Sequence, residues 1–346
     1  MADVHRINFE PVDIEIEVRE DENILDAAFR QGIHLMHGCR EGRCSACKSF
    51  VLDGDVQMAN HSTFACNDAE VEEGYVLLCR TNAYSDCTIE LLNFDEDELL
   101  GGLPIQDIRT RITALVPMTR DIVSLQLEAV EPATYLFKPG QYADVHLPGT
   151  DERRSFSMAT TQSSPGRVEF LIKKYPGGRF AALLENTLAV GDEITLTGPY
   201  GSFTLKDGHV LPVVCVGGGA GMAPILSLLR HMSETACTRP VRFYYGARTA
   251  ADLFYLDEIA ELGAGLADFS FIACLSESMD DVPDSVHVAV GNVTDVVSAH
   301  EPSLDKAEVY LCGPPPMVDA ALALLDSRAV PKDQVFYDKF TSPAFD

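Results

Sequence analysis

The sequence has few basic residues. Its 26 Lys and Arg are set against 53 Asp and Glu, which gives a formal net charge of −27 and a pI near 4.5. A chain this acidic is repelled by phosphate backbones and anionic headgroups, so we expect neither a nucleic acid nor a membrane as partner. Residues 1–100 carry 22 acidic and 7 basic side chains, which suits either plain solubility or a face for a basic protein.

The chain also lacks the marks of export and of a membrane span. Residues 1–6 contain no apolar core of a signal peptide, so we expect a reducing, cytoplasmic location. In such a compartment the simplest expectation is that Cys66, Cys87, Cys215, Cys237 and Cys274 are free, mostly buried thiols. The uncharged stretch 210–229 contains four glycines and two prolines. It is therefore predicted to be a buried strand, a glycine loop and a helix rather than a span.

Four of the cysteines follow a spacing with a specific chemical meaning. Cys39, Cys44 and Cys47, with Cys79 further along, reproduce the C-x₄-C-x₂-C…C pattern by which plant-type ferredoxins hold a [2Fe–2S] cluster. The first three lie in a stretch rich in glycine and charge, which predicts a loop. Cys79 follows an apolar run and is expected at the end of a strand. The pattern predicts one-electron chemistry.

Two other metal sites are weighed against this cluster. Four thiolates also suit structural zinc, but zinc ribbons usually pair two C-x₂-C knuckles and this chain has one. A Rieske centre needs two His ligands. His34 and His37 both precede the first cysteine without a second Cys–His pair, so they are interpreted as ordinary loop or core residues.

Patterning divides the chain into three segments. Residues 1–95 show a strand, a short helix, the cysteine loop and further strands, and residues 96–103 resemble a linker. Residues 104–208 show short alternating strands, which predict a small antiparallel barrel. Residues 209–346 alternate strands and helices, which predicts a parallel α/β sheet. We therefore expect a multi-domain α+β and α/β protein.

The middle segment carries residue types suited to a flavin nucleotide. A cation beside hydroxyls and an aromatic ring in 154–157 fits a phosphate, an isoalloxazine ring and its N5 atom. The glycine-rich start of a helix at 176–180 fits a pyrophosphate. A turn at 198–203 offers rings to an adenine. The candidate flavin residues are Arg154, Ser155, Phe156, Ser157, Lys173, Gly178, Arg179, Phe180 and Phe203.

The last segment carries a glycine loop between a strand and a helix, which brings backbone amides to a dinucleotide pyrophosphate. Arg248, at the end of the next strand, leaves NADH against NADPH open. A second loop follows Cys312, where no Cys–His–Asx arrangement suggests a nucleophile. The candidate nucleotide residues are Gly218, Gly219, Ala220, Gly221, Pro224, Cys312, Gly313 and Pro314. We assign Ser157, Cys312 and the terminal aromatic Phe340 to the reaction centre.

Together these motifs, in this order, resemble the NADH-dependent reductase components of soluble di-iron monooxygenases and ring-hydroxylating dioxygenases. The flavin motif R-x-Y/F-S, the loop G-G-x-G-x-x-P and the loop C-G-P-P-x-M each have a counterpart here. Among the members, the chain looks most like reductases of propane or methane monooxygenases, with benzoate-type dioxygenase reductases related. The resemblance implies a β-grasp-like ferredoxin domain, a Greek-key FAD barrel and a ferredoxin-reductase-like NAD domain.

The resemblance also implies a function. NADH would give hydride to FAD, and single electrons would pass through the [2Fe–2S] cluster to the hydroxylase of a di-iron hydrocarbon monooxygenase. A dioxygenase, a cytochrome P450 or a free ferredoxin remains open as acceptor, and a redox sensor or zinc-stabilised binding protein is a remote alternative. Glu277 stands where NADPH-using relatives place an Arg, which favours NADH. Outside its complex we expect a monomer.

Overall fold

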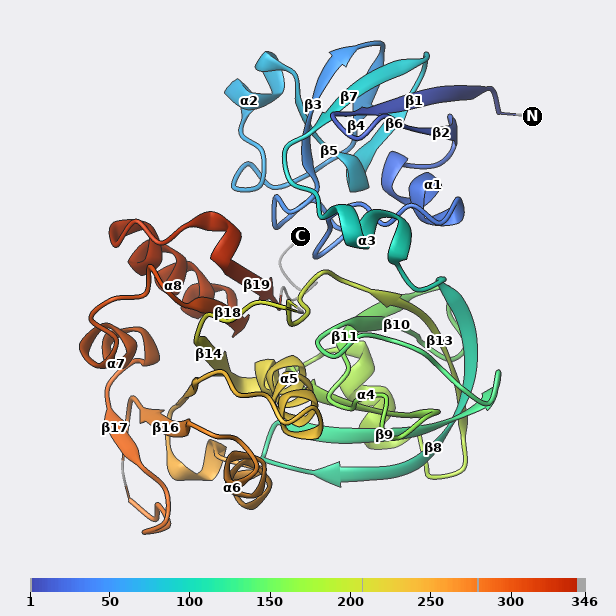
Figure 1. The fold of residues 1–346 in the computed structure, drawn as a ribbon. Helices are drawn as coiled ribbons and strands as arrows, with labels where there is room; N and C mark the ends of the chain where they lie inside the picture. The colour runs from blue at the N-terminus through green and yellow to red at the C-terminus, as the bar shows by residue number, and fades with distance from the viewer. Residues whose placement is uncertain (1, 207, 279, 341–346) are drawn as a thin grey trace. The chain divides into compact units, whose positions relative to one another are not determined.

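The computed structural model describes residues 2–206, 208–278 and 280–340 (Figure 1). Its contacts divide the chain into two compact units. Unit 1 comprises Met1–Gln106 with Pro199–Ser202, and unit 2 comprises Asp107–Gly198 with Phe203–Asp346. Among the described residues, no helix has both the length and the apolar character needed to cross a bilayer.

Unit 1 is built on a five-stranded mixed sheet with strand order β2-β1-β7-β3-β5. Its elements are β1 (Val4–Glu10), β2 (Ile14–Arg19), α1 (Ile24–Arg30), β3 (Lys48–Asp53), β4 (Val56–Met58), α2 (Asp68–Glu73), β5 (Tyr75–Leu77), β6 (Thr81–Ala83), β7 (Cys87–Leu91) and α3 (Glu96–Gly101). β1 pairs antiparallel with β2 and parallel with β7. The alternation in β2 buries Ile16 and Val18 in the core, as its period of two predicts. This mixed sheet is the β-grasp-like arrangement expected for the first domain.

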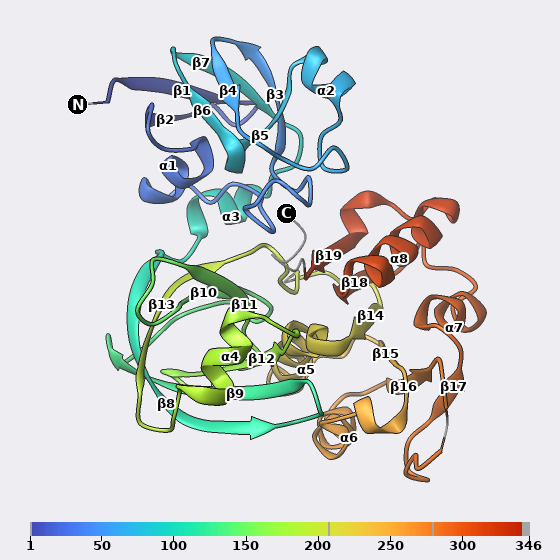
Figure 2. The same cartoon turned by 180° about the vertical axis from the view of Figure 1, so that it is seen from behind.

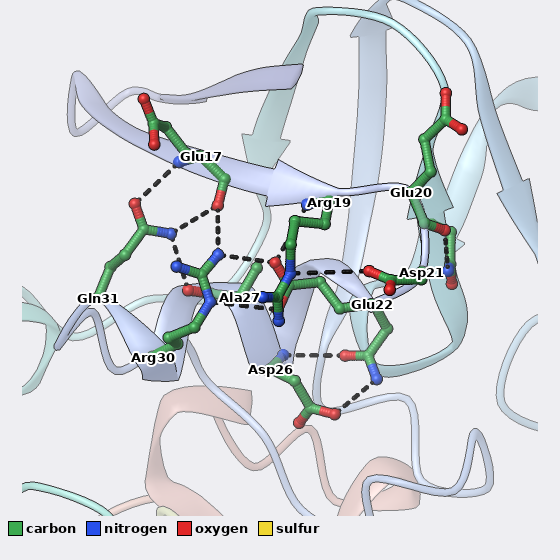
Figure 3. Close-up of polar contacts among 11 residues, drawn as sticks. Glu17, Arg19, Glu20, Asp21, Glu22, Asp26, Ala27, Arg30 and Gln31 are labelled. Atoms are coloured by element: carbon green, nitrogen blue, oxygen red, sulfur yellow. Dashed lines mark hydrogen bonds and ion pairs between the residues drawn. The ribbon is translucent and has the colours of Figure 1, made fainter. Parts of the chain in front are cut away.

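Helix α1 is fastened to β2 at its surface (Figure 3). Asn23 caps the helix by accepting a hydrogen bond from the Asp26 amide at 2.9 Å, as the sequence predicts. Arg30 donates to Glu22 at 2.7 Å and to the Glu17 carbonyl at 2.9 Å. These contacts tie the end of α1 to the preceding strand just before the cysteine loop begins.

The first part of unit 2 is a six-stranded antiparallel sheet with order β11-β10-β13-β8-β9-β12. Its elements are β8 (Gln106–Pro117), β9 (Ile122–Glu131), β10 (Tyr142–His146), β11 (Arg153–Ser157), β12 (Arg167–Lys173), α4 (Arg179–Asn186) and β13 (Glu193–Tyr200). A bridge between Met158, just after β11, and Phe170 in β12 joins the two edge strands. The sheet therefore closes into the predicted barrel, with α4 beside it in both views (Figure 2).

The second part of unit 2 is a six-stranded parallel sheet with order β17-β16-β15-β14-β18-β19. Its elements are β14 (Val213–Gly218), α5 (Met222–Glu234), β15 (Val241–Ala247), α6 (Leu256–Ala264), β16 (Phe269–Leu275), β17 (Val288–Val290), α7 (Val293–His300), β18 (Glu308–Gly313), α8 (Pro315–Ser327) and β19 (Val335–Lys339). One core contains residues of α5 and α6, and another contains residues of α7 and α8. Helices thus cover both faces, as the βα rhythm predicts.

Several local features differ from the sequence expectation. Residues 96–103 were expected as a linker, but Glu96–Gly101 form helix α3. Cys79 lies in a single 3₁₀ turn that follows β5 rather than at the strand's own end. The strand β19 was not foreseen, because its sequence has no clear alternation; it pairs parallel with β18 and so extends the sheet.

Candidate functional site

The four predicted cluster ligands come together in unit 1. Cys44, Cys47 and Cys79 are buried and Cys39 is partly buried. A hydrogen bond from the Cys44 thiol lowers the pKa of Cys39, and one from Cys79 lowers the pKa of Cys47. The sulfurs thus meet as two pairs, Cys39 with Cys44 and Cys47 with Cys79.

Backbone amides of the cysteine loop point at these sulfurs. The Arg43 amide donates to Cys39 Sγ at 3.2 Å, and the Glu41 amide donates to the same sulfur at 3.4 Å. The Cys39 amide donates to Cys44 Sγ at 3.2 Å. Such donors stabilise thiolates that carry negative charge, which is the state that binds iron.

This arrangement suits two irons better than one zinc. A [2Fe–2S] cluster takes two thiolates on each iron, which matches two thiol pairs. Within the residues that the structure describes, no group of three or more His, Cys, Asp or Glu is placed to hold a single metal ion. His37 is turned to the Leu35 carbonyl, which lies 2.7 Å from its Nδ1, in keeping with its assignment as an ordinary loop or core residue.

In unit 2, strand β11 presents the predicted flavin motif. β11 pairs with β10 so that Ser155 lies opposite Asp144, and the Ser155 hydroxyl donates to that carboxylate at 2.6 Å. The Phe156 ring lies 5.2 Å from the ring of Phe180, at the start of α4. The strand and the helix start are therefore neighbours, as one flavin site built from both requires.

The two arginines of the flavin set meet at one carboxylate. Arg154 Nη2 lies 2.8 Å from Glu152 Oε2, and Arg179 Nη1 also contacts Glu152. No side chain caps α4 at Gly178. Guanidinium groups beside an uncapped helix start fit a pyrophosphate. The sequence alone did not identify Glu152 as a site residue, although it stands two residues before Arg154, where the flavin motif begins.

The proposed reaction centre contains an acid that the sequence reasoning also missed. Ser157 is buried, and its hydroxyl donates to Asp338 Oδ2 at 3.3 Å. Desolvation at this partly buried position raises the pKa of Asp338 to about 6. Burial, with the nearby Asp338 charge, raises the pKa of the Cys312 thiol well above its usual range. Cys312 is therefore a neutral thiol, which agrees with the absence of a nucleophile arrangement.

Asp338 reaches this position because β19 lies beside β18. The parallel register places Cys312 opposite Asp338, and the Phe340 amide donates to the Gly313 carbonyl at 3.1 Å. The terminal aromatic therefore stands at the carboxyl ends of these strands, next to the loop that follows Cys312. In the sequence, Asp338 is marked only by standing two residues before the terminal aromatic Phe340.

The glycine loop between β14 and α5 leaves little room for a side chain at Gly218 and Gly221. A Cβ on Gly221 would lie 2.2 Å from the Cys312 carbonyl oxygen, and Gly219 has φ of +58°. Pro224 is buried in the first turn of α5, after Ala220 and Gly221. A strand, a tight glycine loop and a helix in this order are the arrangement that lets backbone amides approach a dinucleotide.

A cavity of about 440 Å³ opens at the carboxyl ends of the parallel strands. Its walls include Gly218 and Gly219 from the glycine loop and Pro314 from the second loop. Lys173 also lines it, and its Nζ lies 3.5 Å from Asp121. Lys173, which the sequence analysis assigns to the flavin, thus lies at the same cavity as the two nucleotide loops.

Two further residues have partners that the sequence does not reveal. Arg248 lines the cavity but is paired with Asp252, with 3.5 Å between Nη2 and Oδ1. Phe203 is buried, and its ring packs edge-to-face on Tyr310 at 5.5 Å. The structure thus gives Phe203 a core contact, which a turn motif alone could not reveal.

Comparison with known families covers most of the chain. Residues 7–84 match the 2Fe-2S iron-sulfur cluster binding domain, residues 110–205 the oxidoreductase FAD-binding domain, and residues 215–322 the oxidoreductase NAD-binding domain. The first match contains all four cluster thiols. The second contains the β11 motif and the third the glycine loop.

Curated relatives match over the full length. The reductase component of propane 2-monooxygenase from Mycolicibacterium smegmatis is 77% identical, with 100% of both chains covered. The phenol 2-monooxygenase reductase component from a Pseudomonas strain is 34% identical over 98% of this chain and 95% of the relative. The toluate 1,2-dioxygenase electron transfer component from Pseudomonas putida is 32% identical over 95% of each.

Solved structures of two reductases have a similar fold over nearly the whole chain. The cytochrome P450 reductase GcoB from Amycolatopsis superposes with a TM-score of 0.84 at 27% identity, covering 98% of this chain and 99% of that one. The ferredoxin reductase of carbazole 1,9a-dioxygenase superposes with a TM-score of 0.76 at 29% identity, covering 98% and 100%. The chain belongs to the family of oxygenase reductase components that join a [2Fe–2S] ferredoxin domain to FAD- and NAD-binding domains.

Proposed function

We propose that this protein takes electrons from NADH and delivers them to the hydroxylase of a propane-oxidising di-iron monooxygenase. The observation that carries the choice of partner is the 77% identity, over the full length, to a propane 2-monooxygenase reductase component. The phenol and toluate relatives are 34% and 32% identical. The same likeness, with the Glu277 position, supports NADH rather than NADPH as donor.

Each site contributes one part of this function. When bound, FAD accepts two electrons from NADH as hydride, and the [2Fe–2S] cluster passes them on singly. Cys39, Cys44, Cys47 and Cys79 would hold the cluster. Arg154 and Arg179 would hold the flavin phosphates, and the glycine loop would hold the NADH pyrophosphate.

Residues around Ser157 would shape the flavin edge. The Ser157 hydroxyl is held by Asp338 at 3.3 Å, which fixes its rotamer and aims its free lone pairs. Cys312 is fully buried and Asp338 is partly buried, so this wall of the site is largely shielded from water. We propose that Ser157 contacts the flavin, that Cys312 supplies a neutral packing surface, and that Phe340 covers the flavin until nicotinamide arrives.

The division of the chain follows from the same sites. We propose a ferredoxin domain at 1–95, a connection at 96–103, an FAD barrel at 104–208 and an NAD domain at 209–346. The cysteines that the structure describes are all free thiols, which supports a reducing, cytoplasmic location. The monomer outside the complex stays a prediction, which sedimentation of the purified chain would check.

The experiment that tests the partner is reconstitution with purified hydroxylases. The protein is combined with NADH and, in turn, with hydroxylases that oxidise propane, phenol or toluate, and product is measured. We expect turnover with the propane hydroxylase to exceed that with the others at least tenfold. Equal turnover with all three would show a general electron donor. A cytochrome P450 is included as a fourth acceptor, because GcoB is a cytochrome P450 reductase. Turnover with the P450 alone would favour that acceptor over a di-iron hydroxylase.

A further inference from the structure

A single carboxylate bridges the two arginines of the flavin-phosphate site. Glu152 stands one residue before β11, and its Oε2 accepts a hydrogen bond from Arg154 at 2.8 Å. Its Oε1 accepts one from Arg179, the first residue of α4. Both oxygens are thus used, each by a different element of the barrel domain.

This bridge uses the donors that a diphosphate needs. Guanidinium groups bind carboxylates and phosphates through the same planar N–H fork, so one set of donors serves either anion. Arg154 Nη1 donates to the carbonyl of Arg153 at 2.8 Å, so Nη2 is the nitrogen that serves an anion. Arg179 is 60% exposed, so it can exchange one partner for another without a change in the core.

We propose that Glu152 is an internal competitor of the FAD diphosphate. It pairs with Arg154 and Arg179, and it must give up at least one of them for the FAD diphosphate to bind both. This inference rests on the flavin site proposed above and adds a residue that regulates its affinity.

The charges give the direction of the effect. Two guanidinium groups balance the two charges of a diphosphate, and Glu152 adds a third negative charge beside them. Replacing Glu152 by Gln removes this charge and keeps the size and shape of the side chain. Glu152→Gln should therefore bind FAD more tightly and release it more slowly than the natural protein.

The test uses the full-length chain, reversibly stripped of flavin, and follows flavin fluorescence during titration. Glu152→Gln should lower the Kd for FAD about five- to tenfold at low salt, the effect expected for one unit charge a few Å from a phosphate. Asp151→Asn is the matched control, because it removes the same charge from an exposed neighbour; its Kd should change less than twofold. An unchanged or weaker affinity in Glu152→Gln would overturn the proposal.

Two further ligands separate charge from shape. FMN carries a phosphate and should also gain affinity in Glu152→Gln, whereas riboflavin has none and should not. An equal gain for riboflavin would contradict the proposal. In an Arg179→Gln background the gain should shrink, because one of the bridged partners is gone. If the natural protein binds no flavin at all, the flavin site itself fails, which is a different result.

Discussion

Unit 1 and unit 2 carry their chemistry in different ways. In unit 1 the site is four side chains of one type, three of them within nine residues of one loop. In unit 2 the proposed sites draw on the ends of β11, β14, β18 and β19 and on the start of α4, and much of the proposed binding surface is backbone. A site made of side chains tolerates no replacement of its atoms, whereas a site made of backbone depends on the space around it.

The largest effect should come from breaking the unit 1 site. Cys79→Ser removes one thiolate of the second pair, so electron delivery to cytochrome c or to the hydroxylase should fall at least a hundredfold, because serine is a poor ligand for the cluster. Flavin reduction by NADH, followed by anaerobic stopped-flow absorption, should persist. Cys87→Ser, in the same unit, is the control and should keep both steps. Loss of flavin reduction in folded Cys79→Ser would contradict the separation of the two units' roles.

The glycine loop of unit 2 should respond to added volume. Gly221→Ala places a Cβ 2.2 Å from the Cys312 carbonyl oxygen, so the loop must shift. Overpacking costs about 1–3 kcal/mol. We therefore expect kcat/KM for NADH to fall roughly tenfold or more, while the cluster and the flavin are retained. Gly101→Ala, where a Cβ would meet nothing within 4 Å, should leave kcat/KM unchanged. A normal value in Gly221→Ala would show that the loop does not bind NADH.

The raised pKa of Asp338 in unit 2 predicts that the stability of the protein depends on pH. Burial raises the pKa of Asp338 to about 6, so the folded state holds a proton that the unfolded state loses above pH 4. Stability should therefore fall as the pH rises from 4 to 6, and the cost at neutral pH is about 3 kcal/mol. Asp338→Asn should melt higher than the natural protein at pH 7, with the gap closing toward pH 5.

The measurement for Asp338 is the melting temperature, followed by flavin release between pH 5 and pH 7.5. Asp326→Asn, at an exposed position on α8, should show no such gap. A constant difference between Asp338→Asn and the natural protein across this range would mean that the carboxyl is ionised throughout.

The smallest effect concerns the surface contacts of α1 in unit 1. Burial favours a higher pKa for Glu22, but hydrogen bonds from Arg30 and the Arg19 amide outweigh it and hold the pKa below its usual range. Glu22→Gln should lower stability by up to about 1 kcal/mol above pH 5, a loss that fades in acid as the natural carboxylate is protonated. Urea unfolding of unit 1 would measure it. Glu15→Gln, whose pair with Arg6 is exposed and 4.0 Å long, should change nothing.

The contrast between the units also explains which parts of the fold and of the sites could be predicted from the sequence. The cluster ligands were predictable because their spacing is itself the motif. The barrel and the parallel sheet were predictable from alternation and from the βα rhythm. Asp338 and Glu152 were not, because each acts through a neighbour supplied by a distant strand or helix, and a single acidic residue in an acidic chain carries no signal. β19 was missed because a short edge strand needs its partner to define it.

The central claim is that electrons from NADH reach the cluster of unit 1 through the flavin of unit 2. The most direct measurement is an anaerobic titration with NADH, followed by visible absorption and by electron paramagnetic resonance. The account predicts bleaching of both flavin and cluster bands and the signal of a reduced [2Fe–2S] cluster, absent in Cys79→Ser. A flavin that is fully reduced beside a cluster that stays oxidised would contradict it.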